Sequence, residues 1–133
     1  MKDKEKRQLI TSGSPYERSI GFSRAVRTGN LIFVAGTAPI AADGSTACPG
    51  DAYGQTRRCL EIMKVAIEEA GGELKHVVRT RLLLTDINLW EEVGRAHGEF
   101  FRDIRPVSTM VQVSALVRSD WLMELEADCV IDS

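Results

Sequence analysis

Cysteine, histidine and long apolar runs are all scarce in this chain of 133 residues. Its three cysteines, Cys48, Cys59 and Cys129, contain no CxxC pair, and their odd number argues against a disulfide framework or a cysteine-rich zinc site. The two histidines, His76 and His97, belong to no HExxH motif, and the chain has neither a Walker loop nor a GxGxxG motif. These absences argue against metal-dependent hydrolysis, nucleotide-loop chemistry and dinucleotide binding.

The chain also lacks a large excess of either charge, with 17 basic and 19 acidic residues and a formal net charge of -2. This balance argues against a protein that mainly neutralises a phosphate backbone. No apolar run approaches the roughly 18–20 residues that span a bilayer. The first ten residues mix both charge signs without the apolar core of a secretory signal. We therefore predict no nucleic-acid partner, no membrane association and a cytoplasmic location.

Length and composition, with 44% hydrophobic residues, fit one ordinary domain. The polar residues 1–18 include Gly13, Ser14 and Pro15, which predicts a flexible N-terminal arm before a single domain over residues 19–133. Within this domain, apolar periodicity predicts strands and two helices. The predicted strands cover residues 23–27, 31–37, 77–84, 108–113 and 121–131, and the predicted helices cover residues 51–70 and 88–104.

Both predicted helices have recognisable end signals. Asp51 stands where the first helix needs an N-cap, and Gly71 with Gly72 supplies a left-handed stop. Asn88 with Glu91 resembles a capping box at the start of the second helix. The order of elements favours an α+β fold in which both helices pack on one face of one sheet.

The opposite face of this sheet is expected to carry both acidic and apolar side chains. Glu124, Glu126 and Asp128 alternate along the last strand, while Phe33 and Val111 come from other strands. An uncovered face with this much apolar surface is a liability for a monomer. We therefore predict self-association through this face, with polar residues lining clefts between subunits.

An ordered set of segments links the chain to a known family. The segments are Ala25-Val26, Gly29-Asn30, 31–36, Gln55-Thr56-Arg57, Ala70-Gly71-Gly72, 77–80, 85–88, Phe100-Phe101, 111–116 and 123–127. In this order and spacing the chain resembles the RidA/YjgF family, whose members include proteins once called L-PSP endoribonucleases. The resemblance implies a chorismate-mutase-like fold, with one mixed β-sheet and two helices on one face, assembled as a homotrimer with ligand clefts between subunits. It also implies hydrolysis of reactive imines or enamines, such as 2-iminobutanoate, to 2-oxo acids and ammonia without a metal or organic cofactor.

The resemblance also assigns residues to the cleft. Glu124 matches the glutamate that positions water, which makes it the predicted catalytic residue. Phe22 stands where the family often has a tyrosine, and Gly36 matches a small residue whose backbone approaches the ligand. Asn88 matches a pocket position, although an N-cap role would also explain it. The predicted substrate-binding set is Phe22, Gly36, Asn88, Ser108, Thr109 and Met110.

The sequence departs from the family at the residue that grips the substrate carboxylate. The usual Pro-Ala-Arg-Ser run reads Pro106-Val107-Ser108-Thr109 here, so Ser108 replaces the arginine. A serine brings no charge and loses the bidentate geometry of a guanidinium. Arg24 and Arg105 are the alternative sources of a positive charge, and an ordinary surface position would also explain each of them.

Two functions stay open from the sequence. The first is a RidA-like small-molecule hydrolase that acts on a reactive imine, enamine or related carbonyl compound by activating water in an intersubunit cleft. The second is a non-catalytic small-molecule-binding or regulatory trimer that has lost the deaminase activity. RNA cleavage is disfavoured by the negative net charge and by the lack of a basic, aromatic surface.

Overall fold

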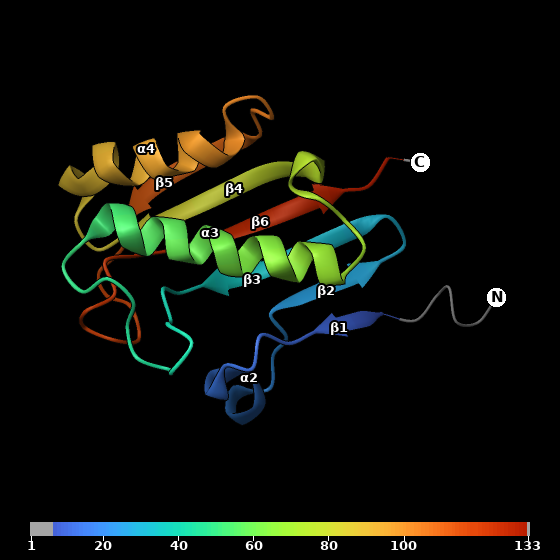
Figure 1. The fold of residues 1–133 in the computed structure, drawn as a ribbon, viewed down its shortest axis with the longest axis horizontal. Helices are drawn as coiled ribbons and strands as arrows, with labels where there is room; N and C mark the ends of the chain where they lie inside the picture. The colour runs from blue at the N-terminus through green and yellow to red at the C-terminus, as the bar shows by residue number, and fades with distance from the viewer. Residues whose placement is uncertain (1–6, 133) are drawn as a thin grey trace.

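A computed structural model describes residues 7–132, which build one mixed six-stranded sheet in the order β1-β2-β3-β6-β4-β5 (Figure 1). Neighbouring strands are antiparallel except β4 and β5, which pair in parallel. The strands are β1 (Gln8–Ile10), β2 (Ala25–Thr28), β3 (Leu31–Thr37), β4 (Val77–Leu84), β5 (Val107–Gln112) and β6 (Met123–Val130). The predicted α+β class and single mixed sheet are confirmed.

Two long helices, α3 (Ala52–Glu69) and α4 (Trp90–Phe101), cover one face of the sheet (Figure 1). A third helix, α2 (Pro15–Ile20), lies beyond the end of β1 and away from the other two. Short 3-10 turns η1 (Leu74–His76) and η2 (Ile87–Leu89) flank β4. The core lies between α3, α4 and the sheet, where Leu60, Met63, Ile67, Leu82 and Leu125 are fully buried.

Helix α3 forms where its end signals predicted. The Asp51 side chain accepts a hydrogen bond from the backbone N–H of Gly54, which satisfies one of the free donors of the first turn. Gly71 follows the helix with a φ of 91°, a left-handed conformation that disfavours side chains with a Cβ. The apolar residues of α3 recur at three- and four-residue steps, so they lie on one side of the helix. This side packs against the sheet.

Two local expectations differ from the structure. The predicted flexible arm over residues 1–18 instead contains β1, which pairs with β2, and most of α2; residues 1–6 lie outside the described part of the chain. Asn88 is not an N-cap through its side chain: the Asp86 carboxylate accepts from the Asn88 backbone N–H and opens η2. Helix α4 therefore begins later, at Trp90, with Leu89 as an N-cap that makes no side-chain hydrogen bond.

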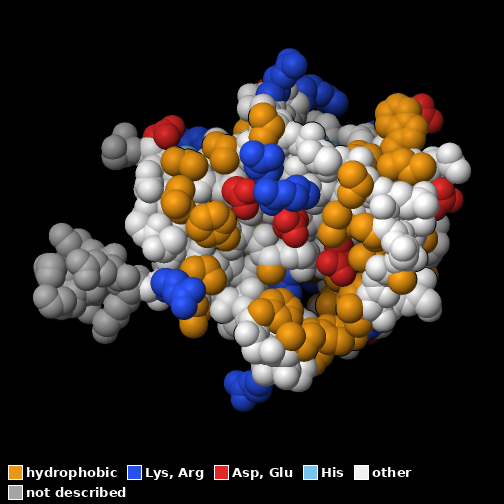
Figure 2. All heavy atoms as spheres, turned by 180° about the vertical axis from the view of Figure 1, so that it is seen from behind, with side chains coloured by type: hydrophobic (Ala, Val, Ile, Leu, Met, Phe, Trp, Pro, Cys, Tyr) orange, Lys and Arg blue, Asp and Glu red, His pale blue; other side chains and the backbone are white. Residues whose placement is uncertain are grey.

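The sheet face away from α3 and α4 carries charged and apolar side chains together (Figure 2). Along β6, the residues Met123, Leu125, Ala127 and Cys129 are buried against the helices, so the acidic residues between them point to the other face. On this face Arg81 forms ion pairs with Glu126 at 2.9 Å and with Asp128 at 3.5 Å. Phe33, Val107 and Val111 are 45%, 58% and 42% exposed, as the predicted uncovered apolar face requires.

Candidate functional site

A cavity of about 300 Å³ lies where α2 meets the ends of β3 and β6. Its walls come from four parts of the chain: the segment around α2, the end of β3 with the loop that follows, α3, and the residues leading into β6. The residues that carry its chemistry are Phe22, Arg24, Gly36, Arg58, Trp121 and Glu124.

Glu124 brings a half-buried carboxyl group to this cavity. It is the second residue of β6, and the alternation of that strand directs it to the face opposite the helices. Burial raises its pKa, the positive charge of Arg24 opposes this rise, and the negative charge of Glu126 adds to it. A carboxyl group with a raised pKa can exchange protons closer to neutral pH than an exposed one.

Gly36 makes room for the Glu124 carboxyl group. A Cβ at this position would lie 2.7 Å from Glu124 Oε1, which is closer than real contacts allow. The pairing of β3 with β6 shifts register between Val34 and Thr37, so Gly36 lies in a β-bulge that interrupts the ladder. At this bulge, the Glu124 carboxyl group therefore lies next to the backbone of Gly36, with no side chain between them.

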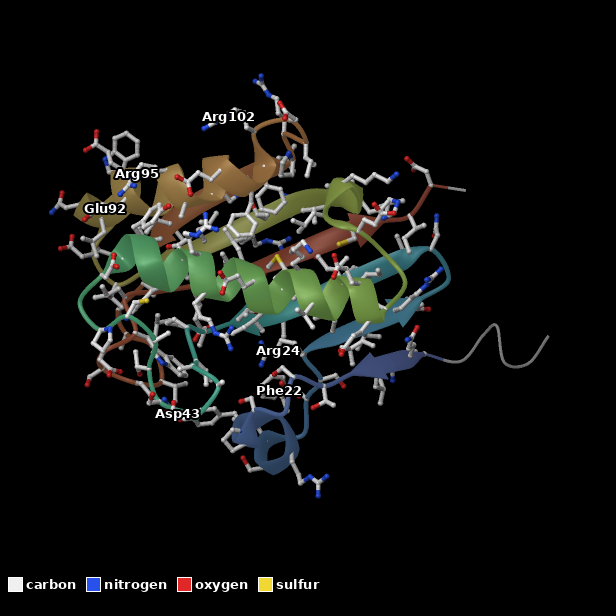
Figure 3. All side chains as sticks on the ribbon, in the orientation of Figure 1. Phe22, Arg24, Asp43, Glu92, Arg95 and Arg102 are labelled. Carbon is white, nitrogen blue, oxygen red and sulfur yellow. The ribbon has the colours of Figure 1, made fainter. Side chains whose placement is uncertain are left out.

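Arg24 is a buried cation beside Glu124. Its Nε donates to Glu17 Oε2 at 3.2 Å, and its Nη1 donates to the Gly36 carbonyl oxygen at 2.6 Å and to Thr37 Oγ1 at 3.2 Å. Its guanidinium carbon lies 5.3 Å from the centre of the Phe22 ring, and both side chains lie between α2 and α3 (Figure 3). These contacts hold the guanidinium in one place at the cavity wall.

Glu17 fastens α2 to this arrangement. Its carboxylate accepts hydrogen bonds from Thr11 Oγ1 at 2.6 Å and from both the backbone N–H and the hydroxyl of Ser12, as well as from Arg24. Burial alone would raise the pKa of Glu17, but the hydrogen bonds from Ser12 and Thr11, together with the charge of Arg24, lower it overall. Glu17 is therefore held as an anion.

The described chain gathers only part of the predicted site. Phe22, Gly36 and Glu124 border the cavity. Asn88 is exposed in η2 and is absent from the cavity wall. Ser108 and Met110 lie beside Thr80 and Leu82 on the helix-facing side of β5, whereas Thr109 lies beside Arg81 on the other side.

Ser108 belongs to a separate chain of hydrogen bonds. Thr80 Oγ1 donates to Ser108 Oγ at 2.8 Å and also lies 2.8 Å from Nε2 of His97. Burial lowers the pKa of His97, which favours its neutral form. Arg105, the other arginine considered, is exposed and does not border the cavity.

The sequence reasoning missed Glu17 and Trp121 as parts of the site. Trp121 is 3% exposed, borders the cavity, and has an Nε1 without a hydrogen-bond partner among residues 7–132. In the same part of the chain, no cluster of three His, Cys, Asp or Glu side chains could hold a metal ion. No described helix is both long enough and apolar enough to cross a membrane.

Comparisons with known proteins agree with this architecture. The sequence model of the family described as Endoribonuclease L-PSP matches residues 14–131. The chain belongs to the RidA/YjgF family. A crystal structure from Mycobacterium tuberculosis, of a protein described as a member of the YjgF/YER057c/UK114 family, has a TM-score of 0.85 and 44% identity and covers 95% of this chain and 100% of that one.

Other RidA/YjgF relatives extend this likeness. The YjgF gene product of E. coli has a TM-score of 0.79 and 28% identity, and the match covers 92% of this chain and 97% of that one. The 3-aminoacrylate deaminase RutC of Acinetobacter baylyi is 34% identical over 101 residues, which are 76% of this chain and 79% of that protein. The RidA/YjgF family therefore includes a relative named for deamination of a small enamine.

Proposed function

We propose that this protein is a RidA-like hydrolase that acts on a small reactive imine or enamine by activating water at Glu124. One observation carries the proposal: the Glu124 carboxyl group, with its raised pKa, lies in a small cavity against the bare backbone of Gly36. The likeness to a 3-aminoacrylate deaminase gives further support. A homotrimer, in which a neighbouring subunit closes the cavity, completes the proposal.

The reaction needs one carboxyl group to move protons in two directions. Glu124 accepts a proton from water as the water oxygen attacks the imine carbon, and it passes this proton to the imine nitrogen, so that a carbinolamine forms. Glu124 then accepts the hydroxyl proton of the carbinolamine and passes it to the amine nitrogen, so that the C=O bond forms as the C–N bond breaks. The products are the carbonyl compound and ammonia, and the carboxylate is regenerated.

Glu124→Gln is the direct test of this mechanism. Glutamine keeps the size and polarity of the side chain but cannot accept the proton from water, so we expect the rate of hydrolysis to fall about 10²–10⁴-fold. The assay generates 2-iminobutanoate with an amino acid oxidase and follows the release of 2-oxobutanoate. Glu126→Gln, on the same strand and face but paired with Arg81, is the matched control. It removes only the smallest of the causes acting on the pKa of Glu124 and should keep most of the activity.

The alternative function, a non-catalytic binding trimer, predicts a different result. Such a protein would bind small ligands in the cavity without accelerating hydrolysis above the background rate. Equal rates for the wild type, Glu124→Gln and a blank without protein would refute the hydrolase. Acceleration that survives Glu124→Gln would refute the assigned role of Glu124.

A further inference from the structure

Arg24 has hydrogen-bonding capacity that the fold does not use. A guanidinium carries five N–H donors, distributed over Nε, Nη1 and Nη2. The hydrogen bonds that Arg24 makes within residues 7–132 come from Nε and Nη1, to Glu17, Gly36 and Thr37. Nη2 therefore remains available on a side chain that is 94% buried and borders the cavity.

The pairing with Glu17 does not exhaust the charge of Arg24. Glu17 receives hydrogen bonds from Thr11 and Ser12 in addition to the single one from Arg24 Nε. Those neutral donors share the stabilisation of the Glu17 carboxylate. Arg24 also opposes the rise that burial causes in the pKa of Glu124, which means that its positive field reaches this carboxyl group.

The surroundings strengthen this field. The Phe22 ring covers the guanidinium at 5.3 Å and shields it from water on that side. Arg58 adds a second guanidinium to the wall, with its Nε held by the carbonyl oxygen of Ile40 at 2.7 Å. The charged groups on the wall are therefore two guanidinium groups and one carboxyl group. Glu61, whose side chain is 53% exposed, lies 3.8 Å from Arg58 Nη1 and compensates its charge only weakly, so the wall still favours an anion.

We propose that Arg24 Nη2 binds the carboxylate of a small 2-oxo or 2-imino acid within one subunit, and thereby fixes the substrate class of the cavity. With the carboxylate on Arg24, the adjacent unsaturated carbon faces Glu124. The inference rests on the proposed function, because it assigns the carboxylate grip for that reaction. Ser108, uncharged and hydrogen-bonded to Thr80 on the helix-facing side of β5, supplies no such grip in the same subunit.

The wild-type protein alone provides a first test. NMR titration would compare 2-oxobutanoate with 2-butanone, which has the same carbon skeleton and carbonyl group but no carboxylate. A charge-assisted contact to a desolvated arginine should make the acid bind about tenfold or more tightly. Equal affinities would overturn the inference, and this result does not depend on whether any variant folds.

Two variants then assign the effect to Arg24. Arg24→Gln should bind the acid at least tenfold more weakly and leave the ketone unaffected. Arg105→Gln, at an exposed arginine away from the cavity, should change neither affinity.

The outcomes separate this inference from the proposed function. If Arg24→Gln binds the acid like the wild type, Arg24 acts only as a structural partner and the inference fails. Acid binding that depends on Arg24 without hydrolysis would refute the hydrolase alone. Hydrolysis that depends on Glu124 without selective acid binding would refute the Arg24 site alone.

Discussion

At the scale of single residues, the site depends on the carboxyl group of Glu124, whose ionised form is less stable in its half-buried position than in water. Glu124 is half-buried, and its carboxyl group occupies space that a Cβ at position 36 would approach to 2.7 Å. Burial raises its pKa, so the folded protein holds this proton more tightly than the unfolded chain does. Burying the ionised carboxylate therefore lowers the stability of the folded protein, and it leaves a group that can act as both a base and an acid.

The pH dependence of protein stability should reveal the cost of burying the ionised Glu124 carboxylate. Because the folded pKa of Glu124 is raised above its ordinary value of 4.5, the folded state binds more protons between the two values, and stability falls as pH rises through the folded pKa. Glu124→Gln removes this cost, so we expect the variant to be more stable than the wild type at pH 7–8 by roughly 0.5–2 kcal/mol. This difference in stability between the variant and the wild type should disappear as the pH falls toward the ordinary pKa of 4.5.

Chemical denaturation of both proteins across this pH range makes the measurement. Glu126→Gln is again the control: it loses an ion pair with Arg81 and should be slightly destabilised, by roughly 0.2–1 kcal/mol. A difference between Glu124→Gln and the wild type that is constant with pH would contradict the raised pKa.

The chemistry of individual residues was only partly readable from the sequence. Strand alternation placed Glu124 on the face opposite the helices, and the family resemblance gave it a role. Nothing local indicated that Arg24 would be buried, because its ion-pair partner Glu17 lies on α2, a helix that the sequence reasoning did not predict. Partners of buried charges come from tertiary structure.

At the scale of elements, long periodic segments were predictable and short ones were not. Helix α3 and strand β4 have the predicted positions because each contains enough residues to show its period. Strand β1 has three residues, of which only Ile10 is buried, so its pairing with β2 decides its conformation. Helix α2 did carry signals, with Ser14 as N-cap, Pro15 at the first turn and Gly21 as a left-handed C-cap.

The end of α3 provides a test at this scale. Gly71 has a φ of 91°, and an added Cβ would lie 2.5 Å from Nη1 of Arg27, which donates to the carbonyl oxygen of Ala70 at 2.8 Å. Gly71→Ala should therefore lower the free energy of unfolding by about 1–2 kcal/mol. Gly94→Ala, inside α4 and with nothing within 4 Å of its added Cβ, should raise it by about 0.5–1 kcal/mol. Denaturant titration checks both, and equal effects of the two changes would contradict the role of the left-handed cap.

At the scale of the whole molecule, the sheet face away from α3 and α4 poses the remaining question. Hydrophobic and charged side chains lie together on it (Figure 2). The exposed apolar residues of this face include Phe33, Val107 and Val111, and its charged residues include the ion pair of Arg81 with Glu126. Apolar surface of this kind marks an interaction site in a folded protein. The proposed homotrimer would bury this face.

Val111→Lys tests this assembly. The side chain is 42% exposed on β5, so a lysine fits on the isolated subunit but would bury a charge inside a packed interface, where an unpaired charge is costly. We expect sedimentation to show a trimer for the wild type and monomers for the variant, with circular dichroism unchanged. Val65→Lys is the matched control, because Val65 is 55% exposed on α3, which lies on the other face of the sheet, and the change should leave the trimer intact. A wild type that sediments as a monomer, or a variant that still assembles, would contradict a homotrimer formed through this face. In the monomer case, the binding of 2-oxobutanoate would depend on a single subunit.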